Sequence, residues 1–290
     1  MTTQSQIEKI TDLALEEDVA RGDITTKILI PDSLAGRGTV YARGEGMLVG
    51  GEVARMIFLK VDQMTTAELL VDDGKQVKPG DVILTVTGRV SSILKAERTA
   101  LNFLSHLSGV ATLVSRYVEA VKGTDVAIAD TRKTMPGMRM LEKYAVYAAG
   151  GHNQRPDLGS GILIKDNHLA AARAKGIGIA EAVAKVRAEA PDGMKVAIEV
   201  TNMEELAEAI KGQPDSIMLD NMSLEDIKEA VKLIPDKVLV EASGGITLEN
   251  VRQVAETGVD LISVGAITHS AKALDFSLEF SRPGGAAKVD

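Results

Sequence analysis

Residues 195–245 read "KVAIEVTNMEELAEAIKGQPDSIMLDNMSLEDIKEAVKLIPDKVLVEASGG", and this stretch decides the fold class of the chain. Three short apolar runs, 195–200, 216–221 and 237–243, alternate with two segments of helical periodicity. The runs are almost continuously apolar, which is expected for strands of a parallel sheet with both faces covered. This alternation predicts βαβ units.

The same rhythm extends to both sides of this stretch. Further strands are predicted at 126–130, 161–166 and 261–266, with helical segments at 140–151, 170–190 and 247–258. The chain therefore carries six predicted strands, where a complete barrel would have eight.

Polar side chains follow nearly every predicted strand. They are Asp130 to Lys133, Lys165 to His168, Glu199, Asp220, Glu241 to Gly245 and Gly265 to His269. In a β/α barrel all carboxyl ends of the strands meet at one mouth, whereas the outer strands of an open sheet end far from any single crevice. The pattern favours a β/α barrel over an open doubly wound sheet.

The part before residue 100 has a different character. A helical pattern ends near Gly22, and short strand-like runs separated by glycines follow, including one that resembles a lipoyl-type hairpin without its lysine. We interpret this part as a scaffold. A long helix with one apolar face is predicted over 96–121 and links the two parts, and 281–290 form a loose tail.

The composition excludes several classes of protein. The chain has 290 residues with a net charge of −8, no cysteine and 3% aromatic residues. Disulfides and thiolate chemistry are excluded, and a broad nucleic-acid surface is not expected. There is neither an apolar run of membrane-spanning length nor a signal-peptide pattern, so we expect a soluble cytoplasmic protein with no membrane partner.

A local cationic cluster stands out against this acidic total. Arg132 and Lys133 follow one strand, Arg155 lies in a glycine- and proline-rich loop, and Lys165 ends the next strand. Any one of these cations could simply be solvated at a rim, but four on neighbouring elements indicate an anion site. Arginine suits carboxylates and phosphates by its geometry, and lysine supplies a compact charge.

Carboxylates and glycines complete the predicted mouth. Glu199 and Asp220 end successive strands and suggest a Mg²⁺ site, with a salt bridge to the lysines as the alternative. Glycines in "EASGGIT" (241–247) and "SVGAITHS" (263–270) favour a phosphate site at the last two strands. No histidine has metal-binding spacing; His152 and His168 are weaker candidates for substrate contact, and His106 is expected to be structural.

The ordered motifs resemble the quinolinate phosphoribosyltransferase family, also called nicotinate-nucleotide pyrophosphorylase (carboxylating). They span about residues 13 to 270. They are "LEEDVARGDITT", "ERTALNFLSHLSGVAT", "DTRKTMPGMRMLEKYAV", "NQR", "LIKDNH", "IEV", "LDN", "EASGGI" and "VGAITHS".

The resemblance implies a fold, a reaction and an assembly. An N-terminal α/β sandwich domain (1–108) would pack on an incomplete β/α barrel (109–270), with the tail 271–290 beside the sandwich. The family joins quinolinate to 5-phosphoribosyl-1-diphosphate, with Mg²⁺, and yields nicotinate mononucleotide, diphosphate and CO₂. It forms at least a homodimer with a shared site.

The resemblance also implies roles for individual residues. Arg132, Gln154, Arg155 and Lys165 would bind quinolinate, and Arg98 would reach the partner subunit's site. Lys133 would face the diphosphate, and Glu199 and Asp220 would lie around the ribose and the metal. The 5-phosphate would be held by Ser243, Gly244, Gly245, Gly265 and Ala266.

One position departs from the family pattern. Gln154 stands where family members usually have His, in "HNQR". Glutamine can donate a neutral hydrogen bond but carries no charge. It suffices if the position only orients a carboxylate; if a positive charge is needed, activity would fall or the substrate would change.

Three alternatives remain at this point. The first is a related phosphoribosyltransferase acting on a different ring carboxylic acid. The second is a binding protein without turnover, which the retained Lys133, Glu199 and Asp220 disfavour. The third is a barrel isomerase or aldolase, in which Lys165 would serve as the reactive lysine.

Overall fold

The structure is a computed structural model that describes residues 3–280, in two compact units. Unit 1 takes the described residues up to Ser115, Met135–Gly150 and those from Thr268 onward. Unit 2 takes Arg116–Thr134 and Gly151–Ile267. The units interleave along the chain more than the sequence-based limits do, which place 1–108 and the tail 271–290 in one domain and 109–270 in the other. Those limits stay a prediction of domain boundaries.

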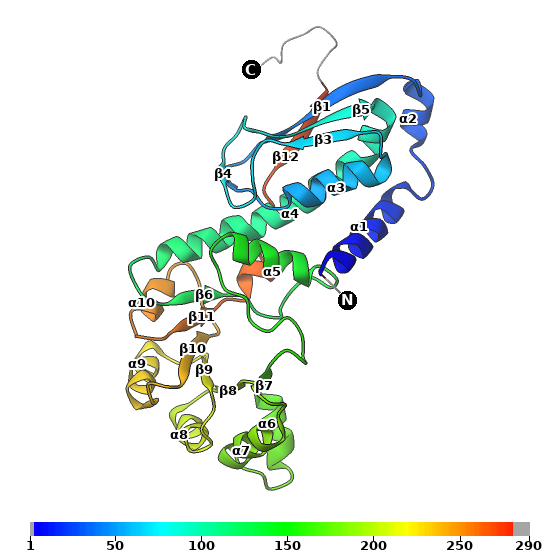
Figure 1. The fold of residues 1–290 in the computed structure, drawn as a ribbon. Coiled ribbons are helices and arrows are strands. Elements are labelled where there is room, and N and C mark those ends of the chain that lie inside the picture. Colours follow the sequence, from blue (N-terminus) through cyan, green and yellow to red (C-terminus); the bar gives the residue numbers. More distant parts are fainter. Residues whose placement is uncertain (1–2, 281–290) are drawn as a thin grey trace. The chain divides into compact units, whose positions relative to one another are not determined.

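Unit 1 is built on a four-stranded antiparallel sheet in the order β12-β1-β5-β3. Its first elements are α1 (Thr3–Val19), α2 (Ile24–Leu29), β1 (Ala35–Ala42), β2 (Gly46–Met47) and α3 (Gly51–Val61). Then follow β3 (Thr66–Leu69), β4 (Gln76–Val77), β5 (Val82–Arg89), α4 (Val90–Ala120), which continues into unit 2 from Arg116, α5 (Arg139–Ala148) and β12 (Phe276–Phe280). Helix α3 packs on β3 and β5 with Ile57 and Phe58 buried (Figure 1).

The chain returns to unit 1 near its end. The amide of Leu274 donates a 3.0 Å hydrogen bond to the carbonyl of Ser105 in α4, and β12 then pairs antiparallel with β1. Gly109 permits this approach, because a Cβ there would lie 2.4 Å from the carbonyl oxygen of Lys272. Residues 281–290, the rest of the tail predicted to join this domain, lie outside the described residues.

The long helix α4 confirms the helical pattern predicted over 96–121, although it begins earlier, at Val90. Its apolar face is buried through Leu101, Leu104 and Leu107. No helix among residues 3–280 is long and apolar enough to cross a membrane.

Unit 2 contains the six predicted strands as one parallel sheet. They are β6 (Ala127–Ala129), β7 (Ile162–Ile164), β8 (Val196–Val200), β9 (Ser216–Asp220), β10 (Leu239–Ser243) and β11 (Leu261–Ser263). The sheet order is β6-β11-β10-β9-β8-β7. The first strand pairs with the last and the others follow in chain order, which is the order around a barrel. In a closed barrel the two strands at the ends of this order, β6 and β7, would also pair. Within residues 3–280 they do not, so the predicted incomplete barrel is confirmed.

A short loop partly fills the gap between β6 and β7. The amide of His152 donates to the carbonyl of Ile128 at 2.7 Å, and the amide of Asp130 donates to the carbonyl of His152 at 3.0 Å. These two bonds lay the loop along β6 as a parallel bridge between Ala129 and His152. The loop that carries Gln154 and Arg155 is therefore fixed to the sheet.

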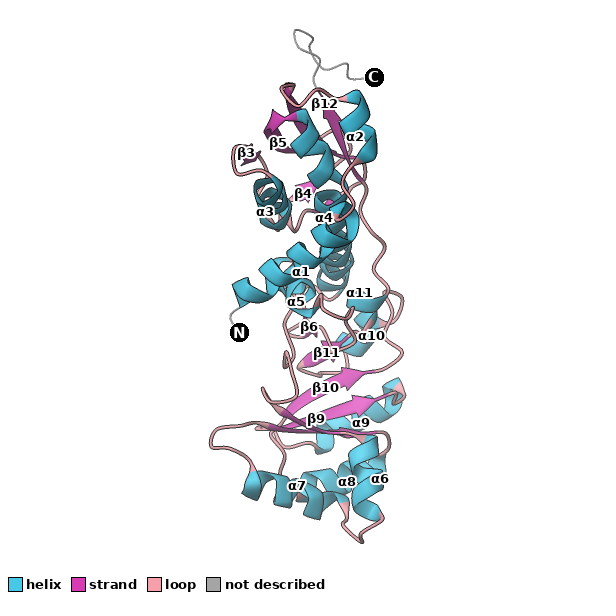
Figure 2. Ribbon diagram, turned by 90° about the vertical axis from the view of Figure 1, so that its right-hand side faces the viewer, coloured by secondary structure: helices cyan, strands magenta, loops and turns pink. Residues whose placement is uncertain are grey.

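Helices cover the outside of this sheet. They are α6 (Asp166–Arg173), α7 (Ile179–Glu189), α8 (Met203–Lys211), α9 (Leu224–Leu233), α10 (Val251–Ala255) and α11 (Ala266–His269), which runs from unit 2 into unit 1. Helices α7 and α8 pack on β8, and Figure 2 shows them with α9 on the same side of the sheet. The segment 170–190, predicted as helical, is broken in two because Gly176 adopts a positive φ of 76°.

Candidate active site

The inward-facing side chains of the barrel are set by the alternation of the strands. Parallel pairing places Met218 opposite both Glu199 and Glu241, and Ser243 opposite both Asp220 and Ser263. Because successive residues of a strand point to opposite faces, residues two apart share the barrel interior. Polar side chains thus form two adjacent layers near the carboxyl ends of the strands.

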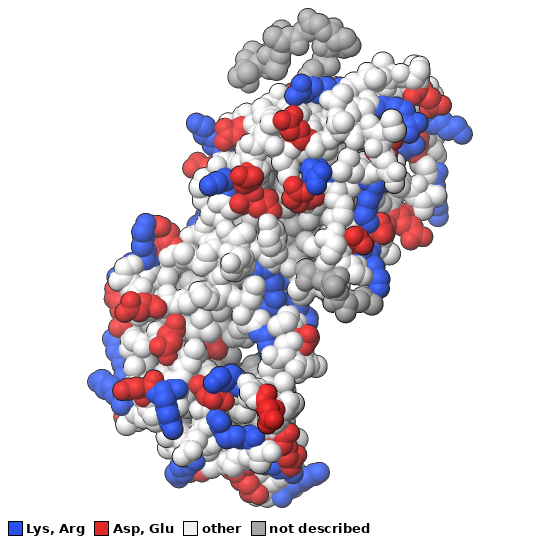
Figure 3. Space-filling model, viewed as in Figure 1, with Lys and Arg blue, Asp and Glu red and all other residues white. Residues whose placement is uncertain are grey.

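A cavity of about 290 Å³ opens at these carboxyl ends, and we call it the mouth cavity. It is lined by Thr131, Arg132, Lys133, Gln154, Arg155, Leu163, Lys165, Glu199, Met218, Asp220 and Ser243. All of these residues belong to unit 2. On the face of unit 2 drawn in Figure 3 basic and acidic side chains are interspersed, so the cationic character of the cavity is a local feature.

Two arginines of the mouth cavity lie close enough for each to feel the other's charge. Arg155 donates from Nη1 to the carbonyl of Gly161 at 2.7 Å, and the buried Nε of Arg132 has no hydrogen-bond partner among the described residues. Burial lowers the pKa of Arg155, and the neighbouring charge of Arg132 lowers it further. Two guanidinium groups that disfavour each other's charge are stabilised by an anion placed between them.

Two carboxylates, Glu199 and Asp220, line the same cavity as these arginines. Lys165 Nζ lies 3.3 Å from Glu199 Oε2. Burial raises the pKa of Glu199; the charge of Lys165 opposes this shift, and the nearby Asp220 adds to it. The salt bridge considered from the sequence therefore exists for Glu199, and it leaves the repulsion between the two carboxylates in place.

The glycines after β10 adopt a conformation that other residues rarely take. Gly244 and Gly245 have φ values of +85° and +65°. A Cβ on Gly244 would lie 2.5 Å from the side chain of Asn221, which itself has a positive φ of 54° and donates to Asp220 Oδ2 at 2.8 Å. The loops after β9 and β10 are therefore packed directly against each other beside Asp220.

Gln154 connects the mouth cavity to a buried polar cluster. Its Nε2 donates to Glu241 Oε1 and, at 2.7 Å, to Ser263 Oγ. Its backbone amide donates to Oδ1 of the fully buried Asp130 at 2.8 Å. Burial raises the pKa of Glu241 to about 7, although hydrogen bonds from Ser263 and Gln154 oppose the shift.

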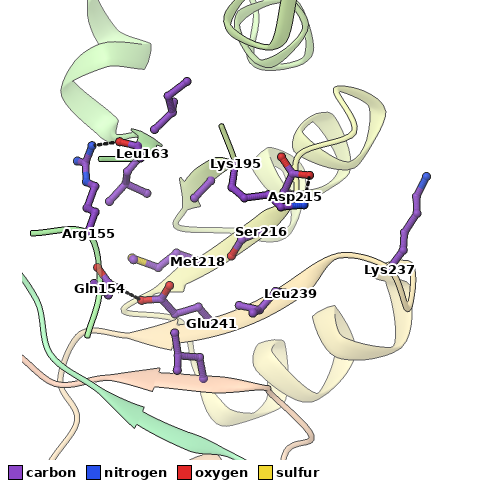
Figure 4. A pocket seen from close by; sticks show the side chains of 14 residues that line it. Gln154, Arg155, Leu163, Lys195, Asp215, Ser216, Met218, Lys237, Leu239 and Glu241 are labelled. Carbon is purple, nitrogen blue, oxygen red and sulfur yellow. Dashed lines mark hydrogen bonds and ion pairs between the residues drawn. The ribbon is translucent and has the colours of Figure 1, made fainter. Parts of the chain in front are cut away.

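A second cavity, of about 450 Å³, lies in the barrel interior beneath the mouth, and we call it the lumen cavity. Figure 4 shows the Gln154 side chain pointing to the carboxylate of Glu241, while Lys195, Asp215 and Lys237 lie at the opposite end. Gln154, Arg155, Leu163 and Met218 line both cavities. Gln154 therefore stands at the boundary between the two spaces.

The structure brings together most residues predicted from the sequence to form a site. Arg132, Lys133, Gln154, Arg155, Lys165, Glu199, Asp220 and Ser243 all line the mouth cavity. Gly244, Gly245, Gly265 and Ala266 follow β10 and β11 but are not part of that lining. Arg98 is an exposed residue of α4 in unit 1. The roles of all these residues stay predictions.

The histidines divide as follows. His106 Nε2 lies 2.8 Å from the buried Glu142, which fits the structural role expected for it. His168 accepts a 3.0 Å hydrogen bond at Nδ1 from the amide of Lys165, and so helps to begin α6. His152 is exposed on the loop beside β6. Neither His152 nor His168 lines the mouth cavity.

Sequence reasoning gave no individual role to Glu241 or Ser263. The available signal was a glutamate inside a strand otherwise apolar on both faces, since such a residue needs a buried partner. Nothing in the sequence identifies Gln154 as that partner, because the two residues are separated by 87 positions.

Comparison with known proteins gives consistent matches over almost the whole chain. The model of the quinolinate phosphoribosyl transferase C-terminal domain matches residues 110–279, and that of the N-terminal domain matches 23–108. Nicotinate-nucleotide pyrophosphorylase (carboxylating) of Mycobacterium leprae is 40% identical over 272 residues, covering 92% of this chain and 94% of that protein.

Solved structures agree. Nicotinate-nucleotide pyrophosphorylase from Francisella tularensis superposes with a TM-score of 0.90 at 38% identity, covering 97% of this chain and 98% of that one. The corresponding protein from Ehrlichia chaffeensis gives a TM-score of 0.89 at 34% identity, covering 94% and 98% of the two chains.

Proposed function

The chain belongs to the quinolinate phosphoribosyltransferase family, and we propose on this premise that it carries out the family's decarboxylating transfer. The enzyme moves the phosphoribosyl group of 5-phosphoribosyl-1-diphosphate to quinolinate and releases nicotinate mononucleotide, diphosphate and CO₂. The observation that carries the proposal is the mouth cavity, in which four cations face two carboxylates at the carboxyl ends of the barrel strands. Two polyanionic substrates need such a receptacle, because fixed cations offset their mutual repulsion.

The cations suit the two carboxylates of quinolinate. Burial and the neighbouring charge of Arg132 lower the pKa of Arg155, an effect that an anion bound here would oppose, and Lys165 lines the same cavity. Planar guanidinium groups bind carboxylates through two parallel hydrogen bonds. Lys133 is exposed at the rim of the same cavity, where it can meet the diphosphate.

Glu199 and Asp220 fit a Mg²⁺ ion together with the diphosphate. Among residues 3–280 no group of three or more His, Asp or Glu side chains is placed to hold a metal ion. Mg²⁺ is commonly bound by one or two carboxylates plus substrate phosphates and water, so this pair is sufficient. The ion would neutralise charge on the diphosphate. It would also offset the charge of Asp220, which adds to the rise in the Glu199 pKa caused mainly by burial.

The chemistry needs positioning and charge stabilisation more than proton transfer. The ring nitrogen of quinolinate attacks the anomeric carbon of the ribose while the bond to diphosphate breaks. That nitrogen carries no proton, so no general base is required. The ring nitrogen is then cationic and stabilises the carbanion left when the adjacent carboxylate departs as CO₂, after which that carbon takes a proton from solvent. The residues of the mouth hold both reactants in line.

Three further expectations stay predictions. The 5-phosphate would be bound by Ser243 and the glycine loops after β10 and β11. The protein would be a cytoplasmic homodimer or larger oligomer. Arg98 would then reach the site of the partner subunit from α4.

The family favours quinolinate over the alternatives raised from the sequence. Relatives such as the Mycobacterium leprae protein are named for the carboxylating reaction, which does not favour a different ring acid. A binding protein or an aldolase would have no need of both the diphosphate and the metal residues.

The decisive experiment measures product directly. Purified protein is mixed with quinolinate, 5-phosphoribosyl-1-diphosphate and Mg²⁺, and nicotinate mononucleotide and CO₂ are quantified, with nicotinate as a competing acceptor. We expect turnover with quinolinate. Turnover with nicotinate alone would reject the carboxylating assignment and favour the related phosphoribosyltransferase.

A further inference from the structure

The amide of Gln154 has no remaining donor for a substrate. A side-chain amide carries two N–H hydrogens on its nitrogen, and here Nε2 donates to both Glu241 and Ser263. Glu241 Oε1 accepts the first of these bonds, and this contact fixes which end of the amide faces the barrel interior. Gln154 therefore lines the acceptor site with a side chain held in one orientation. It does not donate a hydrogen bond from Nε2 to the substrate, contrary to what the sequence had suggested.

The acceptors of these bonds come from two neighbouring strands. Glu241 is in β10 and Ser263 in β11; they are 5% and 1% exposed, so neither is free to move toward solvent. The backbone of Gln154 is held separately through Asp130, at the carboxyl end of β6. Three consecutive strands of the sheet thus fix one residue, and Arg155 follows it directly in the chain.

The location of this cluster gives it a consequence for binding. Gln154 lines both cavities, whereas Glu241 lines the lumen cavity only. The Gln154 side chain forms part of the wall between the two cavities. A change at Glu241 can therefore alter the mouth cavity through Gln154.

We propose that Glu241 and Ser263 are positioning residues that lock the Gln154 amide, so that the carboxylates of the acceptor are bound by Arg132, Arg155 and Lys165 against a rigid floor. The inference rests on the proposed function and adds two residues that do not touch substrate. Burying a carboxyl group lowers the stability of the fold unless the group is well hydrogen-bonded. A positioning role gives a reason for such a group to be present at this site.

The test compares breaking and conserving variants. In Glu241→Leu the lock loses its carboxyl acceptor, and in Ser263→Ala it loses the hydroxyl. We expect each to raise KM for quinolinate by about five- to tenfold, the effect of one hydrogen bond, with KM for 5-phosphoribosyl-1-diphosphate and kcat changed less than about twofold. Glu241→Gln keeps an acceptor oxygen and a similar volume, and should restore most of the affinity for quinolinate.

A double-mutant comparison separates positioning from general damage. In a Gln154→Leu background the lock no longer exists, so adding Ser263→Ala should leave KM for quinolinate unchanged. Ser216→Ala is the matched control, since it removes a hydroxyl from the wall of the same lumen cavity with no bond to Gln154. It should leave both KM values as they are in the unmodified protein.

The outcomes distinguish this inference from the proposed function. If the unmodified protein makes no nicotinate mononucleotide, the proposed function fails, and quinolinate binding by calorimetry replaces KM in the same set of variants. If the unmodified protein is active but Ser263→Ala and Glu241→Leu leave quinolinate affinity unchanged, the lock is refuted. Full additivity of Ser263→Ala with Gln154→Leu would refute it as well, and so would equal losses for the two substrates.

Discussion

Arg155 is positioned by a carbonyl and a neighbouring cation, with Gly161 accepting its hydrogen bond and Arg132 close by. We therefore expect the guanidinium group of Arg155 to bind an anionic ligand. We predict that Arg155→Ala raises KM for quinolinate by about 10- to 100-fold, the range for a lost charge-assisted hydrogen bond. KM for 5-phosphoribosyl-1-diphosphate should change far less, and steady-state kinetics with each substrate varied in turn gives both numbers.

The control for this change is Arg173→Ala, because the exposed Arg173 pairs with Glu205 on α8 and lies outside the mouth cavity. It should leave both KM values unchanged. Equal losses of affinity for the two substrates in Arg155→Ala would contradict the role given to Arg155.

Glu241 makes the stability of the protein depend on pH. Its pKa is raised from the usual 4.5 to about 7, mainly by burial, with Glu199 adding to the shift and Lys165 opposing it. The fold therefore favours the protonated acid. Its cost is absent below about pH 4.5, grows as pH rises toward 7 and is complete above that value.

We predict that Glu241→Gln removes this cost. The free energy of unfolding of the variant should exceed that of the unmodified protein by up to about 3 kcal/mol at pH 8, and the difference should vanish near pH 4.5. Urea unfolding at several pH values measures the difference. A gap that is constant with pH, or that widens toward acid, would show that the carboxyl is not the buried acid described.

At the scale of single residues, the sequence predicts charge and place but not partners. Arg132 and Lys165 were found because they follow apolar strands, and strand ends of a barrel converge. The hydrogen bond from Gln154 to Ser263 joins residues 109 positions apart. It depends on the register of the strands, which cannot be read from the periodicity of the sequence.

At the scale of the element, the turn after β10 shows how local backbone geometry restricts sequence. Gly244 combines a φ of +85° with a Cβ position that falls 2.5 Å from Asn221. Either feature alone disfavours a side chain, and together they require the loop after β9 to move.

We predict that Gly244→Ala costs about 1–3 kcal/mol of stability and raises KM for 5-phosphoribosyl-1-diphosphate more than KM for quinolinate. Thermal unfolding and kinetics on the same preparation measure both effects. Gly193→Ala separates the two causes, since Gly193 has a φ of +77° but no neighbour within 4 Å of its Cβ position. A loss for Gly244→Ala no larger than that for Gly193→Ala would mean that the contact with Asn221 carries no weight.

Most elements could be predicted from periodicity, and the exceptions have identifiable causes. The strands were found because they are continuously apolar, as both faces are covered. The segment 170–190 was predicted as a single helical stretch although it contains two glycines, Gly176 and Gly178. The positive φ of Gly176 is a property of the tertiary turn, which places α7 on β8.

At the scale of the whole molecule, the fold class follows from the order of segments along the chain. Alternating strands and helices of the sequence specify the parallel sheet of unit 2, with first and last strands paired. What order alone does not reveal is the return of the chain: residues 135–150 and 268–280 belong to unit 1 although they lie within or after the barrel sequence. Long-range pairings of this kind, such as β12 on β1, leave no periodic signal at either partner.

The final prediction concerns this return of the chain. Phe276 begins β12, is 4% exposed and pairs with Ala42, so it closes the sheet of unit 1 from the far end of the sequence. Phe276→Ala should lower the free energy of unfolding by about 3–5 kcal/mol, because a large buried side chain is lost and a cavity remains. Leu29→Ala is the control. Leu29 is an apolar residue of the same unit that is 69% exposed, so this substitution should change stability little.

Because the mouth cavity is built entirely from unit 2, KM for both substrates should be unchanged at temperatures where Phe276→Ala remains folded. A variant with native stability would show that β12 is dispensable to the sheet, whereas a folded variant with altered KM would show that unit 1 acts on the site through this strand.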